Sequence, residues 1–293
     1  MNLTVTVLQI VAPVFLLASI GFVWVRVGLE YRIQFVTQLA MMLSLPCLIF
    51  VSLLQTRIAP EALTALSLAS VMAYAVISLA FVALVRLLRL EGRTYTAPLI
   101  FGNTGNLGLP LALFAFGDLG LSYAIIVFAI MALWSYTYGI WLVAGTGSFG
   151  RVLLEPLVWA TVLGALFMWQ GWETPDFLTT TLELVGQMAI PMMLLTLGVA
   201  VARLSAKGML RAVGLSFVKL LLCVAVAWGV GTVFELDRIA FGVLVLQVAT
   251  PVAVTSYLIA EKYGADAPSV AGLVVASTLM SVAALPLILA FVL

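Results

Sequence analysis

The sequence predicts an all-α integral membrane protein whose ten transmembrane helices form two inverted five-helix repeats. Three observations predict this fold class: an apolar composition, the spacing of the charged residues and a repeated order of prolines. Hydrophobic residues make up 65% of the 293 positions and charged residues 9%, and the mean hydropathy is +1.26. So large an apolar fraction is typical of a polytopic membrane protein rather than a soluble domain.

Uncharged intervals between charged residues are interpreted as membrane spans, because each is near or above the roughly 20 residues that a helix needs to cross a bilayer. Two of the ten intervals contain a single charged residue: Glu183 in the seventh and Lys219 in the eighth. The first segment lacks a basic region and a cleavage site, so we expect it to be retained as a span. In order, the ten segments are Leu3–Val25, Ile33–Thr56, Ala62–Val85, Thr94–Gly117, Leu119–Gly150, Pro156–Trp172, Phe177–Ala202, Ala212–Phe234, Ile239–Ala260 and Ala267–Leu293.

Basic residues are distributed unequally between the two sets of loops. The loops after segments 2 and 8 hold Arg57 and Arg238. The odd-numbered loops hold ten basic residues, against these two on the opposite side. Because basic residues gather on the cytoplasmic side, the odd-numbered loops should face the cytoplasm, which leaves both termini outside a multi-pass protein of the inner or plasma membrane. The ten basic residues of the odd-numbered loops are Arg26, Arg32, Arg86, Arg89, Arg93, Arg151, Arg203, Lys207, Arg211 and Lys262.

Several function classes lack the residues they require. The chain has no histidine, and Cys47 and Cys223 lie in separate apolar stretches, so we expect no metal site and no cofactor. A net charge of +1 without a basic patch gives no indication of a nucleic-acid partner. No phosphate-binding loop, nucleophile elbow or pair of carboxylates appears, so we expect no enzyme and a process driven by a gradient or the membrane potential.

Prolines recur in the same order in the two halves, at offsets of 143, 145 and 141 residues. The pairs are Pro13 with Pro156, Pro46 with Pro191, and Pro110 with Pro251. We therefore divide the chain into residues 1–150, with segments 1 to 5, and residues 151–293, with segments 6 to 10. Five spans are an odd number, so the second repeat lies inverted in the membrane, as in secondary transporters.

Segments 4 and 9 contain stretches that disfavour a regular helix. The run GNTGNLGLP at residues 102–110 combines several glycines with a proline, which cost about 1 and 3 kcal/mol each in a helix interior. We assign the break to Gly102, Gly105, Pro110 and Pro251. Side chains beside these positions are the candidate substrate ligands: Asn103, Thr104, Asn106, Gln247 and Thr250.

An unwound stretch inside hydrocarbon has a physical implication. Its peptide groups are tolerated only where protein or water in a cavity satisfies them, so such a stretch lines a site. The half-helix N-termini that it exposes favour an anion. The amides of Asn103 and Asn106 could donate to a carboxylate, or could cap the broken backbone instead.

The two ions inside spans admit two interpretations each. A buried charge in a span is a functional hypothesis, because it costs roughly 3 kcal/mol to insert there. Lys219 could instead extend its ammonium toward the cytoplasmic surface, and Glu183 could reach the outer surface. We retain both as candidates for a gating or charge role.

Three stretches of the sequence are similar to those of the auxin efflux carrier family, which includes the auxin exporters of plants and bacterial malonate or malate transporters. They are GNTGNLGLPL at residues 102–111, LSLPCLIF at 43–50 and TPVAVTSYLIAEKYGADAPSVAGLVVASTLMSVAALPL at 250–287. With the ten-span plan, the resemblance extends over the whole chain.

The resemblance implies a fold related to bile-acid symporters and sodium/proton antiporters. In that fold segments 4 and 9 cross at their prolines, within a transport domain of segments 3, 4, 5, 8, 9 and 10. Segments 1, 2, 6 and 7 would form a scaffold that makes a homodimer, and the transport domain would move as an elevator. The plant carriers use a carboxylate in segment 3, but this segment has no acid between Glu61 and Arg86.

We therefore expect a secondary transporter of a small organic anion, held at the crossing of segments 4 and 9. The coupling ion, either H⁺ or Na⁺, and the alternative of uniport stay open. A sodium-coupled symporter of neutral or zwitterionic solutes is the first alternative, with Asn106 and Gln247 as cation ligands. A membrane sensor that binds without transporting is the second.

Overall fold

The protein, seen in a computed structural model, is described over residues 3–55, 59–145, 156–204 and 208–293. Within these residues every regular element is helical, apart from one isolated β-bridge. The predicted segment ends Thr56 and Gly150, the repeat boundary at residue 150, and the basic residues Arg57, Arg151 and Lys207 lie outside the described residues.

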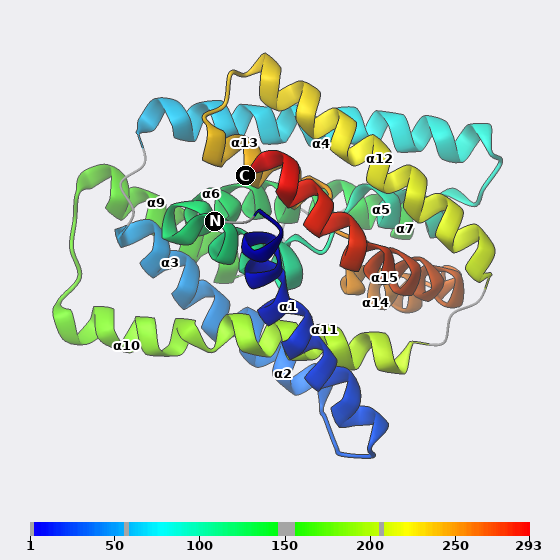
Figure 1. Ribbon diagram of the computed structural model, residues 1–293, viewed down its shortest axis with the longest axis horizontal. Coiled ribbons are helices and arrows are strands. Elements are labelled where there is room, and N and C mark those ends of the chain that lie inside the picture. The colour runs from blue at the N-terminus through cyan, green and yellow to red at the C-terminus, as the bar shows by residue number, and fades with distance from the viewer. Residues whose placement is uncertain (1–2, 56–58, 146–155, 205–207) are drawn as a thin grey trace.

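Helices alternate with short connections through the first half of the chain (Figure 1). They are α1 (Leu3–Arg26), α2 (Ile33–Leu39), the π-helical turn η1 (Ala40–Ser44), α3 (Leu45–Gln55), α4 (Pro60–Leu87), α5 (Gly92–Ile100), the π-helical turn η2 (Thr104–Gly108), α6 (Leu109–Trp134), the π-helical turn η3 (Ser135–Gly139) and α7 (Ile140–Ala144).

The second half is built in the same way. It contains α9 (Pro156–Gln170), α10 (Asp176–Gln187), α11 (Ala189–Arg203), α12 (Met209–Val233), α13 (Arg238–Val248), α14 (Val254–Lys262) and α15 (Ala267–Val292). Helix starts follow local sequence: the Asp237 carboxylate accepts hydrogen bonds from the amides of Ile239 and Ala240, and Asp266 caps α15 in the same way.

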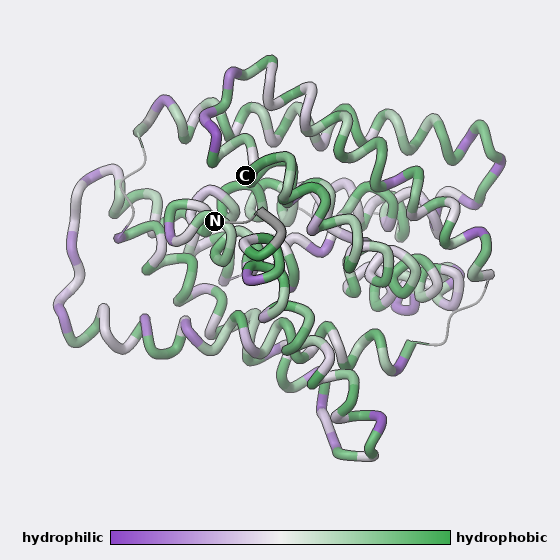
Figure 2. The backbone as a smooth tube through the Cα atoms, viewed as in Figure 1, coloured by the Kyte–Doolittle hydropathy of each residue, from purple (hydrophilic) through white to green (hydrophobic). Residues whose placement is uncertain are grey.

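Seven helical stretches in the described residues are long and apolar enough to cross a membrane. Figure 2 shows that hydrophilic residues gather in the connections while the helices are largely hydrophobic. The predicted all-helical, multi-pass membrane protein is therefore confirmed, whereas the count of ten spans, their orientation and the repeat remain predictions.

One of these stretches, residues 104–144, spans 41 residues, or about 60 Å at 1.5 Å per residue. That length is roughly twice the hydrocarbon core. Inside it, Gly117 has φ +66° and ψ −158°, a kink at which two helices join. The kink coincides with the boundary predicted between segments 4 and 5, and glycine adopts this left-handed backbone without a side-chain clash.

Two sets of helices pack more within themselves than with each other. The α1 group consists of α1, α2, α3, α9, α10 and α11, in which α1 packs along α11 and α3 packs on α9 and α10. The α6 group consists of α4, α5, α6, α7, α12, α13, α14 and α15. In Figure 1, α4 and α12 run along one edge of the molecule, and α10 continues into α11 along the opposite edge.

Glycines permit the closest contacts in the α1 group. A Cβ on Gly198 of α11 would overlap the backbone carbonyl of Ala18 in α1, and one on Gly21 would overlap that of Leu195. Without a hydrophobic driving force between helices in lipid, close backbone approach through small residues is a main source of stability. The two helices are therefore fixed against each other at backbone level.

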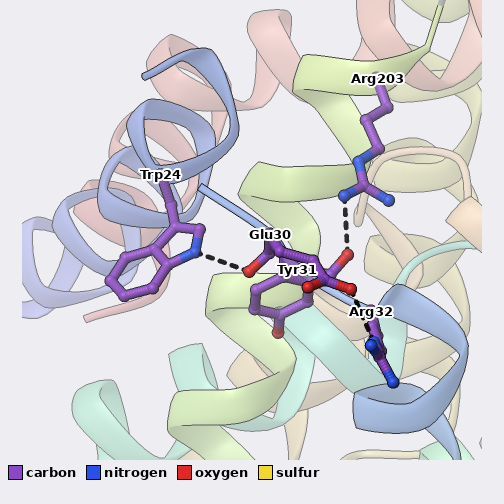
Figure 3. A network of polar contacts seen from close by, with 5 residues as sticks. All are labelled: Trp24, Glu30, Tyr31, Arg32 and Arg203. Carbon is purple, nitrogen blue, oxygen red and sulfur yellow. Dashed lines mark hydrogen bonds and ion pairs between the residues drawn. The ribbon is translucent and has the colours of Figure 1, made fainter. Parts of the chain in front are cut away.

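Polar contacts secure one end of the same group (Figure 3). The Arg203 guanidinium donates to the carbonyl of Tyr31 at 2.7 Å, and the Tyr31 hydroxyl lies 2.8 Å from that of Thr196. Trp24 donates to the Glu30 carbonyl, and Arg32 pairs with the Glu30 carboxylate. Burial raises the pKa of Tyr31 above its ordinary value, although the Thr196 bond opposes this.

Candidate functional site

Two broken helices meet in the α6 group. The helical structure is interrupted between α5 and η2, at residues 101–103, and again between α13 and α14, at residues 249–253. Gly102 and Val252 form an antiparallel β-bridge: the amide of Asn103 donates to the Pro251 carbonyl at 2.7 Å, and the amide of Ala253 donates to the Phe101 carbonyl at 3.4 Å. Each break thus satisfies part of the backbone that the other exposes.

The bridge requires glycine where the two chains touch. A Cβ on Gly102 would overlap the Thr250 hydroxyl. Six residues further along, a Cβ on Gly108 would overlap the carboxamide of Gln247. These two glycines therefore let the broken stretches approach each other, which explains part of the glycine content of the run at residues 102–110.

The break in segment 4 lies earlier than predicted. It covers residues 101–103, and Pro110 lies inside the helix that follows rather than in the break. Proline lacks an amide for the carbonyl four residues earlier and its ring presses on that carbonyl. The π-helical turn η2 makes room instead, because the amide of Leu109 bonds to the Thr104 carbonyl five residues before it.

As a consequence, Pro110 and Pro251 do not occupy equivalent places. Pro251 lies within its break, whereas Pro110 lies in the helix after its break. The helices before the two breaks end at Ile100 and Val248, which are 148 residues apart. The offset of 141 that pairs these prolines in the sequence is therefore not the offset of the two breaks.

A cavity of about 80 Å³ lies on one side of the crossing. Gly102, Asn103, Gly105 and Asn106 contribute to its wall from segment 4, and Ala253 and Thr255 from segment 9. Met41 of η1 and Leu157 of α9 close it from the α1 group. The remaining residues of the wall are Phe101, Phe128, Met131, Ala132, Ser135, Tyr136 and Ile259.

Asn103 presents an unsatisfied donor at this cavity. Its side chain is 5% exposed, and its Nδ2 atom has no hydrogen-bond partner. It does not cap the turn that follows, although it holds the N-cap position of η2. A buried amide without a partner costs roughly 1–3 kcal/mol, which a ligand that accepts the hydrogen bond would recover.

Three other predicted ligands lie within the crossing rather than on the cavity wall. Gln247 is fully buried against Gly108, and both atoms of its carboxamide lack a partner. The Thr104 hydroxyl is also buried without a partner. Thr250 is already engaged, because its hydroxyl donates to the Gln247 carbonyl at 2.6 Å and so closes the end of α13.

Lys219 reaches the crossing from α12. It is 2% exposed, and its Nζ donates to the carbonyl of Leu99 at 2.9 Å, one residue before the end of α5. The Sγ of Cys223 lies 4.0 Å from the same nitrogen. Its ammonium therefore does not extend to the surface, as the alternative interpretation of the sequence had it.

Glu183 lines neither the cavity at the crossing nor the void beside Lys219. Its carboxylate accepts a short hydrogen bond from Gln55 of α3, within the α1 group. It lines a second cavity of about 470 Å³ between the two groups, together with Asp118 and Gln187. We call this the intergroup cavity, bounded by α3, α6, α10 and α11.

One residue of the crossing was missed by the sequence reasoning. The Ser277 hydroxyl of α15 accepts a hydrogen bond from the amide of Val252 at 3.0 Å, so it satisfies the second break. A serine inside an apolar span carries no signal of such a contact, since the contact joins residues 25 positions apart through the tertiary structure. Within the described residues no group of three or more Cys, Asp or Glu could hold a metal ion.

Comparison with known proteins gives consistent matches. The family described as membrane transport protein matches residues 6–152 and 148–289. An uncharacterized transporter of Methanothermobacter thermautotrophicus is 28% identical over 205 residues, which are 67% of this chain and 68% of the relative. An uncharacterized transporter of Methanocaldococcus jannaschii is 24% identical over 196 residues, 62% of each protein.

Proposed function

Because this chain belongs to the membrane transport protein family, the auxin efflux carrier-like family that its motifs resemble, we propose that it is a secondary transporter of a small organic anion. That it is a transporter rather than an enzyme follows from the family and from its transporter relatives. The proposed substrate is a mono- or dicarboxylate, bound at the crossing by Asn103 and Asn106. Substrate class and mechanism are our proposals.

The unpaired Nδ2 donor of Asn103 carries this proposal. It lies at the cavity wall and at the start of η2, where the first amides of a helix have no intrahelical acceptor. Donors of this kind and the positive end of a half-helix both favour a carboxylate. Asn106 lines the same cavity one turn further along.

The charge around the crossing supports an anion as well. Lys219 supplies a positive charge, and α5, α12, α13 and α15, which pack around the crossing, contain no Asp or Glu; the one acid of α4, which packs on three of them, is Glu61 in its first turn. Asp118 and Glu183 line only the intergroup cavity. The attraction for a carboxylate is therefore concentrated at the crossing.

We propose alternating access by movement of the α6 group against the α1 group. Hydrogen bonds fix each group internally: Arg93 donates to the carbonyls of Val143 and Tyr263 within the α6 group, and Tyr123 donates to Asp237. Between the groups, the hydroxyls of Ser52 and Ser122 lie 3.1 Å apart. A neutral hydrogen bond of this kind contributes little net free energy, so breaking it during a movement costs little. The intergroup cavity would be the route to the crossing.

Purified protein in liposomes on a solid-supported membrane tests the proposal. We expect a saturable current on adding a carboxylate, and Asn103→Ala should weaken half-saturation by roughly 10- to 100-fold, the value of a hydrogen bond to a charged group. Thr137→Ala is the matched control, since that hydroxyl bonds to the Leu133 carbonyl of its own helix. No current for any carboxylate, with or without Na⁺, would sink the proposal.

One observation favours the sodium-coupled alternative. The buried oxygens of Gln247 and Thr104 have no partner and could serve as cation ligands beside the unwound carbonyls. Under that alternative a neutral or zwitterionic solute, rather than a carboxylate alone, gives a current, and only when Na⁺ is present.

A further inference from the structure

The wall of the cavity at the crossing carries no charged side chain among the residues that the structure describes there. We call this cavity of about 80 Å³ the crossing cavity. Its polar side chains are the amides of Asn103 and Asn106 and the hydroxyls of Ser135, Tyr136 and Thr255. A second carboxylate on the same ligand would be buried there without a compensating cation, which is costly. The wall therefore suits a ligand with one negative charge better than a dianion.

The rest of the wall is apolar and leaves little space. Its aromatic and thioether side chains include Phe128, Met131 and Met41. A volume of about 80 Å³ is roughly what two to three water molecules fill in the liquid, whereas pockets for drug-sized ligands hold about 300–1,000 Å³. The crossing cavity therefore has room for a carboxylate with a short apolar chain.

A second void, of about 10 Å³, lies directly beyond one end of the crossing cavity. The two share three wall residues: Phe101, Ser135 and Ile259. The second void is lined further by residues of α5, η3, α7 and α14, among them Gly139 and Arg93. Space inside the α6 group therefore continues past the crossing cavity, and Phe101 lies at the junction.

Two features of its surroundings hold the Phe101 ring at this junction. Its backbone is extended, with φ −93° and ψ 123°, and side chains two residues apart on an extended chain share a face. Phe101 thus lines the crossing cavity beside Asn103. Behind the buried ring lies Gly139, where an added Cβ would be 2.6 Å from the ring atom Cε2. The ring therefore lies directly on the backbone of η3, with the crossing cavity in front of it.

We propose that the Phe101 ring, seated on Gly139, closes one end of the crossing cavity and sets the length of the carboxylate that the protein accepts. Short monocarboxylates are then preferred over longer ones and over dicarboxylates. This inference rests on the proposed function and makes Phe101 a specificity-determining residue. One methylene too many in an apolar pocket costs a factor of roughly 10–200, so the preference should have a sharp upper limit.

Currents on a solid-supported membrane test the inference by giving the half-saturation concentration of each straight-chain monocarboxylate from acetate to octanoate. Wild-type protein should show a chain length beyond which that concentration rises by about tenfold or more per added methylene. The dicarboxylate of the same carbon number should need a concentration at least about tenfold higher than the monocarboxylate, because its second charge has no partner on the wall.

Two substitutions should move this length limit in opposite directions. Phe101→Ala joins the crossing cavity to the second void, so longer chains should be accepted. Gly139→Ala pushes the ring into the crossing cavity, so only shorter chains should be accepted. In the double variant no ring remains to be displaced, and its limit should therefore equal that of Phe101→Ala alone.

Two matched controls make the same kinds of substitution elsewhere in the α6 group. A Cβ on Gly231 would lie 2.7 Å from the ring of Phe241, and Phe81 is fully buried in α4. Neither phenylalanine lines the crossing cavity or the second void. Gly231→Ala and Phe81→Ala should therefore leave the length limit unchanged, even where they lower stability.

Several results would overturn the inference while leaving the carboxylate carrier intact. They are a wild-type protein without a length limit, dicarboxylates that match monocarboxylates, and a limit that Phe101→Ala or Gly139→Ala does not move as expected. If Phe101→Ala does not fold, the milder Phe101→Leu should raise the limit in the same direction, and an unchanged limit would count against the inference. No current for any carboxylate would overturn the proposed function and this inference with it.

Discussion

The two breaks that meet at the crossing have the same backbone plan and different chemistry. Each follows a half-helix, and each donates one amide to the other through the bridge of Gly102 and Val252. The break of segment 9 is closed by neighbouring hydroxyls: Thr250 bonds to the Gln247 carbonyl, and Ser277 accepts from the amide of Val252. The break of segment 4 retains an unpaired amide on Asn103 and is closed at its other end by a charge, Lys219.

This difference indicates a division of roles between symmetric elements. The backbone of the segment 9 break is satisfied by the protein itself, and the unpaired carboxamide of Gln247 beside it lies against Gly108 rather than at the cavity wall, so this break serves mainly to hold the crossing together. The segment 4 break keeps a donor for which the protein supplies no acceptor, and a buried donor of this kind is costly unless a ligand uses it. The comparison therefore predicts that substitutions at the two breaks separate binding from stability.

The largest expected effect comes from preventing the two groups from moving. Ser52→Cys with Ser122→Cys, in a chain whose Cys47 and Cys223 are replaced, should form a disulfide, because the two hydroxyls lie 3.1 Å apart. Oxidation should abolish transport and reduction should restore it. Equal transport by the oxidised and the reduced protein would show that both breaks work without relative movement of the groups.

A smaller effect separates the ligand contributions of the two breaks. Asn106 and Thr255 line the same cavity, each from the helical turn that follows one of the two breaks. Asn106→Ala should weaken carboxylate binding by roughly tenfold, whereas Thr255→Ala should change it by less than about threefold, since one donor amide to an anion is worth more than a neutral hydroxyl. Titration of the purified variants measures both. The reverse ranking would place the ligand on segment 9.

Gly102→Ala tests the backbone contact rather than binding. The added methyl overlaps the Thr250 hydroxyl, and overpacking of this kind costs about 1–3 kcal/mol. Thermal denaturation in detergent should show the loss, and Thr250→Ala in the same chain should restore part of it by removing the overlapping atom. If the double variant is no more stable than Gly102→Ala, the bridge is not limited by this contact.

The smallest effect is expected for Thr250→Ala alone. It removes the hydroxyl that closes α13, a loss of about 0.5–1.5 kcal/mol of stability. Carboxylate affinity should stay within about threefold of wild type, because the hydroxyl is already used inside the protein. A loss of affinity like that of Asn103→Ala would show that the second break binds the substrate too.

Much of this site was predictable from the sequence. Glycine and proline in an apolar stretch predict a break, and Asn103 and Asn106 are polar where polarity is costly, so the sequence alone indicates both as candidate ligands. The position of the break was not predictable to the residue, because Pro110 is accommodated by a π-helical turn that begins six residues earlier. The hydrogen bond between the Val252 amide and the Ser277 hydroxyl was not predictable either, because it joins residues 25 positions apart.

Composition and charge spacing by themselves determined that this chain is helical and spans a membrane, since hydrocarbon admits only backbone that satisfies its own hydrogen bonds. The glycine-rich run determined that one helix is interrupted. Only the tertiary structure decided what satisfies each interruption: a second stretch of the same chain 150 residues away, the hydroxyl of Ser277 and the ammonium of Lys219. Those contacts depend on how the helices pack, and packing joins residues that no local pattern connects.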